Sequence, residues 1–309
     1  MIVLFLGLLT FVLALATFVN VRGPMIETVQ DRYTKDNFRF FNPCSSTNSK
    51  GLLATAWRYS NRCYCPDRWL PLINDYSKQN SYVYLSIGGH VKDAVAIDTS
   101  VFGPADGYED PRITWIDDST LFILFVKFIK NVESSDMCAG LIDVGPSGFT
   151  MTRTRMFTST QRQKNWIAKV NNSTSIDLYA RIESPQIVYH LSTTELVGHS
   201  VIEIQSCSLP SSWRGSSFFC ASKGRHVALV HRRLTPTLMN RFMPSYDYAF
   251  CYLDRGIVTF SEPFQLKDPK GFVYASGLQV NAQTGSYEIS AGITDCYSET
   301  IQANENEKR

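Results

Sequence analysis

Residues 107–113 read Gly-Tyr-Glu-Asp-Pro-Arg-Ile, so two adjacent acids lie beside a proline and an arginine. A strand-like apolar run follows directly over residues 114–125. Because neighbouring side chains of a strand point to opposite faces, we expect Asp110 and Arg112 on one side and Glu109 on the other. A carboxylic acid held beside a cation on a rigid strand suits the proton transfers of sugar chemistry. The structural alternative is a charged turn with a local ion pair.

The composition describes an ordinary folded chain. The length of 309 residues is enough for one large domain or two small ones. The chain is 44% hydrophobic and carries a formal net charge of +2. A nearly neutral chain offers no broad surface for nucleic acid, and we expect no such partner. Residues 302–309 form a polar tail.

The N-terminus differs from the rest of the chain. Residues 1–20 contain no charged side chain, and Arg22 is the first charge. About twenty apolar residues can cross a bilayer, so residues 1–22 are interpreted as a signal peptide or signal anchor. A small-x-small site at residues 14–16 would allow cleavage, whereas the absence of basic residues before it favours an uncleaved anchor. We expect membrane contact through residues 1–20 and a secretory-pathway protein, anchored or secreted.

Two other features fit that route. The overlapping sequons Asn-Asn-Ser-Thr at residues 171–174 are acceptors for N-glycosylation. The chain also has an even set of eight cysteines, and an oxidising lumen would allow some disulfides, whose pairing the sequence does not give. The Cys-Tyr-Cys at 63–65 is too tight for a zinc knuckle.

Short runs rich in Val, Ile, Tyr and Phe recur between Gly, Pro, Asn, Asp and Ser, which is typical of strands. The sequence shows no long amphipathic helix, βαβ alternation or glycine-rich phosphate loop. We therefore predict an all-β fold. The clearest runs are residues 81–87, 121–128, 176–181, 187–191, 227–230 and 272–275.

A short motif with Pro, Trp or Gly precedes a strand at five places, spaced by roughly 50 to 70 residues. Five sheets around one axis would place every motif near a central funnel, whereas a β-sandwich, the alternative, would not need one polar motif per repeat. We predict a five-bladed β-propeller over residues 23–301. The motifs are Asn-Pro (42–43), Glu-Asp-Pro-Arg (109–112), Lys-Asn-Trp (164–166), Arg-Gly-Ser (214–216) and Ser-Glu-Pro-Phe (261–264).

In this order, the motifs resemble those of the five-bladed β-propeller family of inverting β-mannoside phosphorylases and related β-1,2-mannosyltransferases. The resemblance covers nearly the whole chain after residue 35, and its specific parts are residues 109–112 and 164–166. The other matching elements are 39–43, Arg58, 214–217, 228–231, 261–264 and 292–296.

The resemblance implies that Asp110 is the general acid, which protonates the glycosidic oxygen through a neighbouring sugar hydroxyl while phosphate attacks the opposite face. In reverse, mannose 1-phosphate is the donor. Because phosphate is itself a nucleophile, such an enzyme needs one carboxyl group and an anion site. An inverting hydrolase needs a second carboxylate, roughly 6.5–9.5 Å away, to activate water.

Basic residues at or beside the motifs supply candidates for the anion site. Lys164 and His231 are the first choices, and only one of Arg232 and Arg233 is expected to face the funnel. The predicted phosphate-binding residues are Arg162, Lys164, His231 and Arg232. The predicted substrate-binding residues, which include aromatic platforms for sugar, are Asn42, Arg58, Tyr108, Glu109, Arg112, Asn165, Trp166, Tyr248, Glu262 and Asp295.

Three functions follow as hypotheses. The first is mannosyl transfer between a mannose-containing glycan and inorganic phosphate or mannose 1-phosphate. It needs no cofactor, and the sequence lacks the Asp-x-Asp motif with which a nucleotide sugar is held through a metal. The second is a hydrolase with Glu262 or Asp295 as its second carboxylate. The third is a carbohydrate-binding propeller without catalysis.

Overall fold

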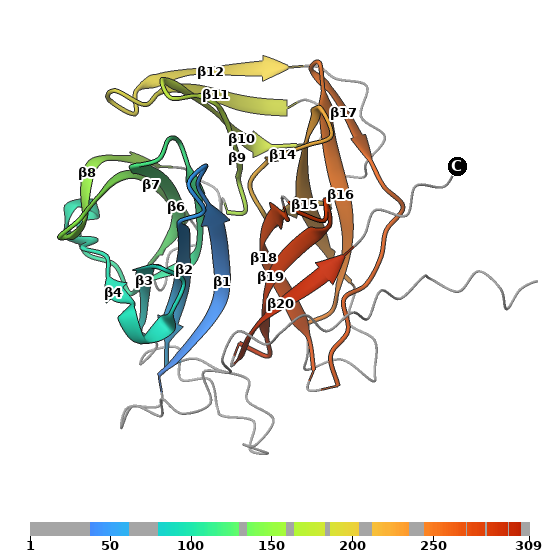
Figure 1. Cartoon of the computed structure of the whole chain (residues 1–309), viewed down its shortest axis with the longest axis horizontal. Helices are drawn as coiled ribbons and strands as arrows, with labels where there is room; N and C mark the ends of the chain where they lie inside the picture. Colours follow the sequence, from blue (N-terminus) through green and yellow to red (C-terminus); the bar gives the residue numbers. More distant parts are fainter. Residues whose placement is uncertain are drawn as a thin grey trace, which may run out of the picture.

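The chain folds as a five-bladed β-propeller (Figure 1), which confirms the predicted all-β class and number of blades. The computed structural model describes residues 38–61, 80–129, 135–158, 164–182, 186–203, 212–234, 244–269, 271–281, 283–295 and 297–303. Two short 3-10 helices, η3 (Val91–Asp93) and η4 (Ser100–Phe102), follow the third strand.

Each blade is an antiparallel sheet formed by strands close in sequence. The first contains β1 (Arg39–Thr47), β2 (Leu53–Ser60), β3 (Ser81–Ile87) and β4 (Val95–Ala96). The second contains β5 (Gly107–Trp115), β6 (Thr120–Phe128), β7 (Ser135–Gly145) and β8 (Gly148–Phe157). The third contains β9 (Ile167–Asn172), β10 (Ser175–Arg181), β11 (Gln186–Ser192) and β12 (Gly198–Glu203).

The last two blades are less regular. In the fourth, β14 and β13 both pair with β15. Its strands are β13 (Arg214–Gly215), β14 (Cys220–Ser222), β15 (Arg225–Arg233), β16 (Tyr246–Asp254) and β17 (Ile257–Phe260). The fifth has three strands, β18 (Val273–Val280), β19 (Tyr287–Ile293) and β20 (Tyr297–Ala303).

The ring closes where the first blade meets the fifth, and Figure 1 shows β1 beside β18. The Ser276 hydroxyl donates to the Pro43 carbonyl at 2.7 Å, and the Thr47 hydroxyl donates to the Gln279 amide oxygen at 3.2 Å. These contacts join residues more than 200 positions apart. The closed ring brings polar residues of different blades to one axis, as the hydrogen bonds of Arg112 to Asn165, Ser216 and Tyr274 show.

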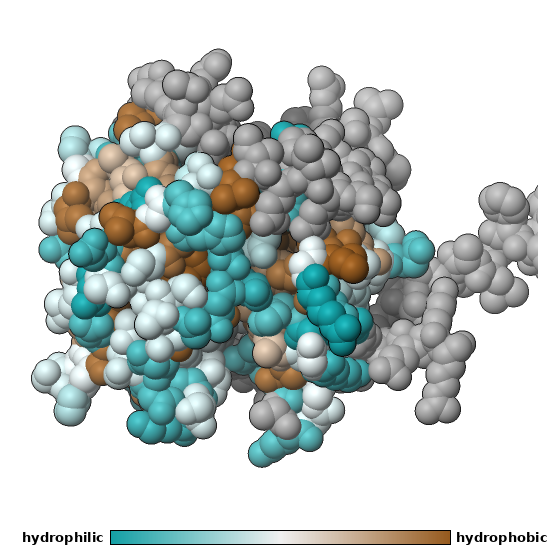
Figure 2. Space-filling view, turned by 90° about the horizontal axis from the view of Figure 1, so that it is seen from above, coloured by the Kyte–Doolittle hydropathy of each residue, from teal (hydrophilic) through white to brown (hydrophobic). Residues whose placement is uncertain are grey.

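The hydrophobic core lies between consecutive blades. Along β6, Leu121, Ile123 and Phe125 pack toward the first blade, and the alternating Phe122 and Leu124 pack toward the third. A strand covered on both faces reads as a continuous apolar run instead of an alternating one. The side of the molecule in Figure 2 accordingly shows hydrophilic residues with apolar ones in small groups among them.

The predicted run over residues 114–125 is two strands, not one. β5 ends at Trp115 and β6 begins at Thr120. Between them, the Asp117 carboxylate accepts hydrogen bonds from the backbone N–H groups of Ser119 and Thr120, each at 2.8 Å. An aspartate that bonds its own backbone two residues on is a turn former, and it reverses the chain here.

The described residues include Cys44, Cys138, Cys220 and Cys251. The first three are free thiols and do not form the expected disulfides. The other four cysteines and the predicted signal segment, residues 1–22, lie outside the described residues. Within the part of the chain that the structure describes, no helix is long and apolar enough to cross a membrane. The two sequon asparagines, Asn171 and Asn172, are the exposed last residues of β9, directly before the turn to β10.

Candidate active site

Three polar residues take the same unusual backbone conformation in the first three blades. Asn42, Asp110 and Asn165 have φ angles of 51°, 50° and 67°. Among non-glycine residues, Asn and Asp tolerate this left-handed region best. Asn42 and Asp110 lie in β-bulges of β1 and β5, where the strand pairing shifts, and Asn165 lies just before β9. A bulge re-aims side chains, and here it brings these residues together.

Both acids of the second motif meet one guanidinium. Arg58 Nη2 lies 2.6 Å from Glu109 Oε1, and Arg58 Nη1 lies 3.6 Å from Asp110 Oδ1. The Asn42 amide donates to the same Asp110 oxygen at 3.0 Å. The expectation that Glu109 and Asp110 face opposite sides was wrong, because the bulge interrupts the alternation of the strand.

The Arg58 side chain is buried and oriented from several sides. Its Nε donates to the Ser81 hydroxyl at 2.9 Å, and that hydroxyl donates to the Tyr108 carbonyl at 2.8 Å. Its guanidinium also lies 5.2 Å from the centre of the Phe41 ring, in cation–π range. The arginine therefore holds the two carboxylates in a fixed geometry.

Arg112 joins the second blade to the other side of the axis. It is fully buried, and its Nε donates to the Ser216 carbonyl at 2.7 Å. Its Nη2 donates to Asn165 Oδ1 at 3.1 Å, the Gly215 carbonyl at 3.2 Å and the Tyr274 hydroxyl at 3.3 Å. Its Nη1 has no hydrogen-bond partner in the described structure. One buried N–H of a cation is thus left for a ligand.

Lys164 supplies a second available cation. Its half-buried ammonium makes no hydrogen bond or ion pair in the residues that the structure describes. Its charge nevertheless acts on both Asp110 and His231, which places it at the same centre. A guanidinium N–H beside a lysine ammonium is a donor set that suits a phosphate group.

The environment sets the charge of the acid. Burial works to raise the pKa of Asp110, but Arg58, Lys164 and Arg112, with the Asn42 hydrogen bond, lower it by more. The net shift is downward, so Asp110 is ionised in the free protein near neutral pH.

His231 completes the centre as a neutral side chain. Its Nδ1 lies 2.8 Å from the Ser216 hydroxyl, and its ring packs edge-on to Tyr246 and Tyr274 at 5.5 and 5.4 Å. Burial first, then the positive charges of Arg112 and Lys164, lowers the pKa of His231 from 6.5 to about 3.

A dependence of stability on pH follows from His231. The unfolded chain gains a proton as the pH falls below about 6.5, and the folded protein gains it only near pH 3. The contribution of neutral His231 to the unfolding free energy is therefore fully present above pH 6.5. It is lost as the pH falls from 6.5 toward about 3, by up to about 1.4 kcal/mol per pH unit. Unfolding free energies measured with urea between pH 6.5 and about 4 should depend less steeply on pH in His231→Gln than in the natural protein. Equal dependences of the unfolding free energy on pH in the two proteins would contradict the assignment.

Three predicted sugar platforms lie in the core instead. The Trp166 ring is 1% exposed and stacks on Tyr189 at 5.3 Å. The Tyr108 hydroxyl donates to the Thr99 and Gly103 carbonyls, and the Tyr248 hydroxyl donates to the Val273 carbonyl at 2.8 Å. Their polar atoms are used by the fold, because packing between blades needs large aromatic side chains.

Of the other predicted residues, Glu262 and Arg232 lie away from the axis, whereas Asp295 lies near the site. Glu262 is exposed in the loop after β17. Arg232 pairs with Asp247 at 2.7 Å, because along β15 it points away from the side of His231. Asp295 acts electrostatically on Arg58 and so lies near the site. Arg162 lies outside the described residues.

Sequence reasoning did not single out three of the residues that build the site. Ser216 lies in the fourth motif but was not assigned a role, and Ser81 begins a predicted strand. Tyr274 lies in β18, the strand of the fifth blade that faces the axis, and its hydroxyl donates to Asn165 Oδ1 at 3.1 Å. Its position in the strand that follows the fifth motif could have identified Tyr274, but the sequence analysis considered only the motif itself, Ser-Glu-Pro-Phe.

The chain matches no family model and no curated protein, but solved structures share its fold. The mannose phosphorylase MPT-4 from Leishmania mexicana, in complex with a phosphate ion, is 13% identical with a TM-score of 0.54, over 88% of this chain and 86% of that one. MPT-1, a GDP-Man-dependent mannosyltransferase from Leishmania mexicana, is 14% identical with a TM-score of 0.52, over 89% of both chains.

A third similar structure represents the GH130 family of mannoside phosphorylases, which contains glycoside hydrolases that target β-1,2 mannosidic linkages in Candida mannan. It is 12% identical with a TM-score of 0.54, over 88% of this chain and 86% of that one. At these identities the likeness concerns the fold, and the chemistry must be argued from the residues at the axis.

Proposed function

We propose that this protein is a carbohydrate-active enzyme that transfers a mannosyl unit, with inversion, between a β-mannoside and phosphate or a phosphosugar donor. Asp110 is the general acid. The carrying observation is the axial centre, where the buried Asp110 lies beside Glu109 and among three cations, and two cationic donors have no partner among the described residues. Phosphorolysis requires this combination of one acid and one anion site. The similar structures, a phosphorylase, a transferase and hydrolases, support the substrate class.

The lowered pKa of Asp110 in the free protein is compatible with this proposal if the bound ligand raises it. An acid that is ionised in the free protein must gain a proton before it can donate one. A phosphate group bound by Lys164 and Arg112 brings negative charge beside Asp110 and offsets two of the cations that lower its pKa. Anion binding thus raises the pKa of the acid in the complex in which it must act.

The test is phosphate release. The purified protein is incubated with mannose 1-phosphate and a panel of mannose and β-mannobiose acceptors, and inorganic phosphate is followed over time. Release that requires an acceptor establishes phosphosugar-linked transfer. Transfer from GDP-mannose and not from mannose 1-phosphate would show that the donor is a nucleotide sugar. Sugar binding without turnover on any donor would indicate a carbohydrate-binding propeller without catalysis.

Lys164 should determine the requirement for phosphate. Lys164→Ala is expected to raise the KM for phosphate or mannose 1-phosphate by roughly tenfold to a hundredfold, because a hydrogen bond to a charged group contributes about 1.5–3 kcal/mol. The KM for the acceptor should change little. Lys50→Ala, which removes an exposed lysine paired with Asp118, is the matched control. An equal rise in both KM values would assign Lys164 a structural role.

Hydrolysis is the second candidate function, and the position of one carboxylate supports it. Of the two predicted second carboxylates, Glu262 is exposed, whereas Asp295 lies near enough to act on Arg58. Asp295 could therefore activate water opposite Asp110. Release of mannose from a β-mannoside in phosphate-free buffer, lost in Asp295→Asn, would favour the hydrolase.

Residues 1–20 give the proposal for location. We propose that they direct the protein into the secretory pathway and hold it at, or release it from, the membrane. Expression in secreting cells, followed by N-terminal sequencing and membrane fractionation, distinguishes an anchor from a cleaved signal. Cytosolic recovery of the intact chain would contradict both.

A further inference from the structure

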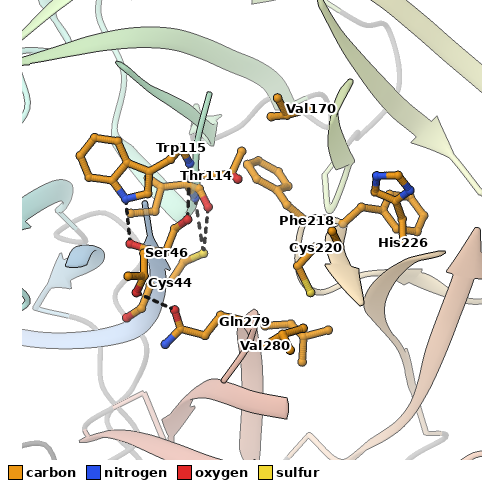
Figure 3. A pocket seen from close by; sticks show the side chains of 16 residues that line it. Cys44, Ser46, Thr114, Trp115, Val170, Phe218, Cys220, His226, Gln279 and Val280 are labelled. Atoms are coloured by element: carbon orange, nitrogen blue, oxygen red, sulfur yellow. Dashed lines mark hydrogen bonds between the residues drawn. The ribbon is translucent and has the colours of Figure 1, made fainter. Parts of the chain in front are cut away.

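A hollow lies on the propeller axis, apart from the acid and the cations. Its volume is about 310 Å³, and all five blades contribute to its wall (Figure 3). Figure 3 shows side chains from the different blades facing it from opposite sides. Representative members, one from each blade in chain order, are Cys44, Thr114, Val170, Phe218 and Gln279.

The lining of the hollow is separate from the candidate active site, since neither Asp110 nor any of the three cations around it belongs to the lining. In each blade, the lining residue follows the active-site residue by a few positions along the chain, as Cys44 follows Asn42 and Thr114 follows Asp110. Cys44 and Ile113 line the hollow, both are 2% exposed, and the Ile113 N–H lies 3.4 Å from Cys44 Sγ, which packs β1 on β5. The hollow is therefore displaced from Asp110 along the axis, by about 3.3 Å for each residue of strand between them.

The wall of the hollow carries no charge. None of its described lining residues is Asp, Glu, Lys or Arg. Burial, followed by the charge of Lys169, lowers the pKa of His226, and burial raises the pKa of the Cys44 and Cys220 thiols to about 11 and about 12. All three groups are neutral near pH 7. A phosphosugar or a carboxylate ligand finds no counter-charge here.

The same wall combines apolar faces with polar groups. The Trp115 and Phe218 rings and Val280 offer apolar surface. The Thr114 hydroxyl and the His226 ring line the hollow and make no hydrogen bond within the described residues. An apolar floor with a few unpaired polar groups is the usual make-up of a small-molecule site, and the volume falls at the lower end of the range for such sites.

We propose that this hollow is a second, non-catalytic site that binds one neutral pyranose unit, with the sugar hydroxyls bonded to Thr114 and His226 and its apolar face on Phe218. The choice of a sugar rests on the proposed function, whereas the neutral, amphipathic character of the ligand rests on the lining alone. A glycan chain held in the hollow would remain bound to the protein while its end is processed at Asp110.

The test counts binding sites for D-mannose by isothermal titration calorimetry on the full chain. We expect two sites in the natural protein. Thr114→Val, which keeps the shape and removes the hydroxyl, should weaken one of them about tenfold, since a lost hydrogen bond costs about 1–1.5 kcal/mol. Ala221→Trp, which fills the hollow, should abolish that site. Thr259→Val on exposed β17 is the matched control.

The outcomes separate this inference from the proposed function. One mannose site that neither Thr114→Val nor Ala221→Trp affects would overturn the second site, even with phosphate release intact. Two sites of which the hollow variants remove one would support it, even if no donor gives turnover. Thermal unfolding of each variant identifies misfolding, and Thr114→Val, a single near-isosteric change, keeps the test valid if Ala221→Trp does not fold.

Discussion

Asp110→Asn is expected to reduce turnover by roughly a hundredfold to ten-thousandfold, the range that general acid catalysis contributes. Asparagine has nearly the same shape and can keep the contact with Asn42, but it carries no transferable proton. Sugar binding should therefore be largely retained. Phosphate release in the forward and reverse directions, together with calorimetric binding of mannose, checks both parts.

The control for Asp110 is a carboxylate of similar burial elsewhere. Asp247 is 8% exposed and pairs with Arg232 in the fourth blade, away from the axial centre, so Asp247→Asn should keep its activity. Near-natural turnover in Asp110→Asn would show that another group donates the proton. Loss of turnover in both variants, with lowered melting temperatures, would instead indicate a general effect on folding.

Arg112→Met is expected to destabilise the fold by about 3–5 kcal/mol, as the loss of one partner from a buried charged network usually does. Methionine fills part of the space, but the carbonyls of Gly215 and Ser216 lose their donors, and Asn165 Oδ1 keeps only the Tyr274 hydroxyl. Since Arg112 bonds to the third, fourth and fifth blades, the loss affects the centre of the ring. Urea unfolding measures the change.

Arg232→Met supplies the comparison for Arg112. Arg232 pairs with Asp247 on the neighbouring strand of its own blade. The Arg232 side chain is 34% exposed, and partly exposed ion pairs contribute about 0–1 kcal/mol. We expect a small change in unfolding free energy for Arg232→Met. Similar effects of the two substitutions would mean that the axial network contributes little to stability.

The all-β class and the five blades could be predicted because they depend on local patterns. Short apolar runs and turn residues repeat along the chain, and a strand such as β6 is apolar throughout because its two faces pack on different blades. The polar motifs also marked the axis for the first three blades, where Asn42, Asp110 and Asn165 lie. These are properties of residue type and spacing.

The aromatic predictions failed for a general reason. Trp166, Tyr108 and Tyr248 border motif residues, and proximity in sequence suggested sugar platforms. Their side chains instead pack in the hydrophobic clusters between blades, because large rings bury much apolar surface. Sequence position does not tell which face of a strand meets a neighbouring blade.

The sequence by itself determined the type of fold, the acid-proline motif and a cation near it, since all three follow from residues close together in the chain. Only the tertiary structure decided that Glu109 and Asp110 share Arg58, that Tyr274 and Ser216 join the centre, and that Glu262 does not. The physical reason is that bulges in β1 and β5 change the direction of side chains, and ring closure brings together strands more than 100 residues apart.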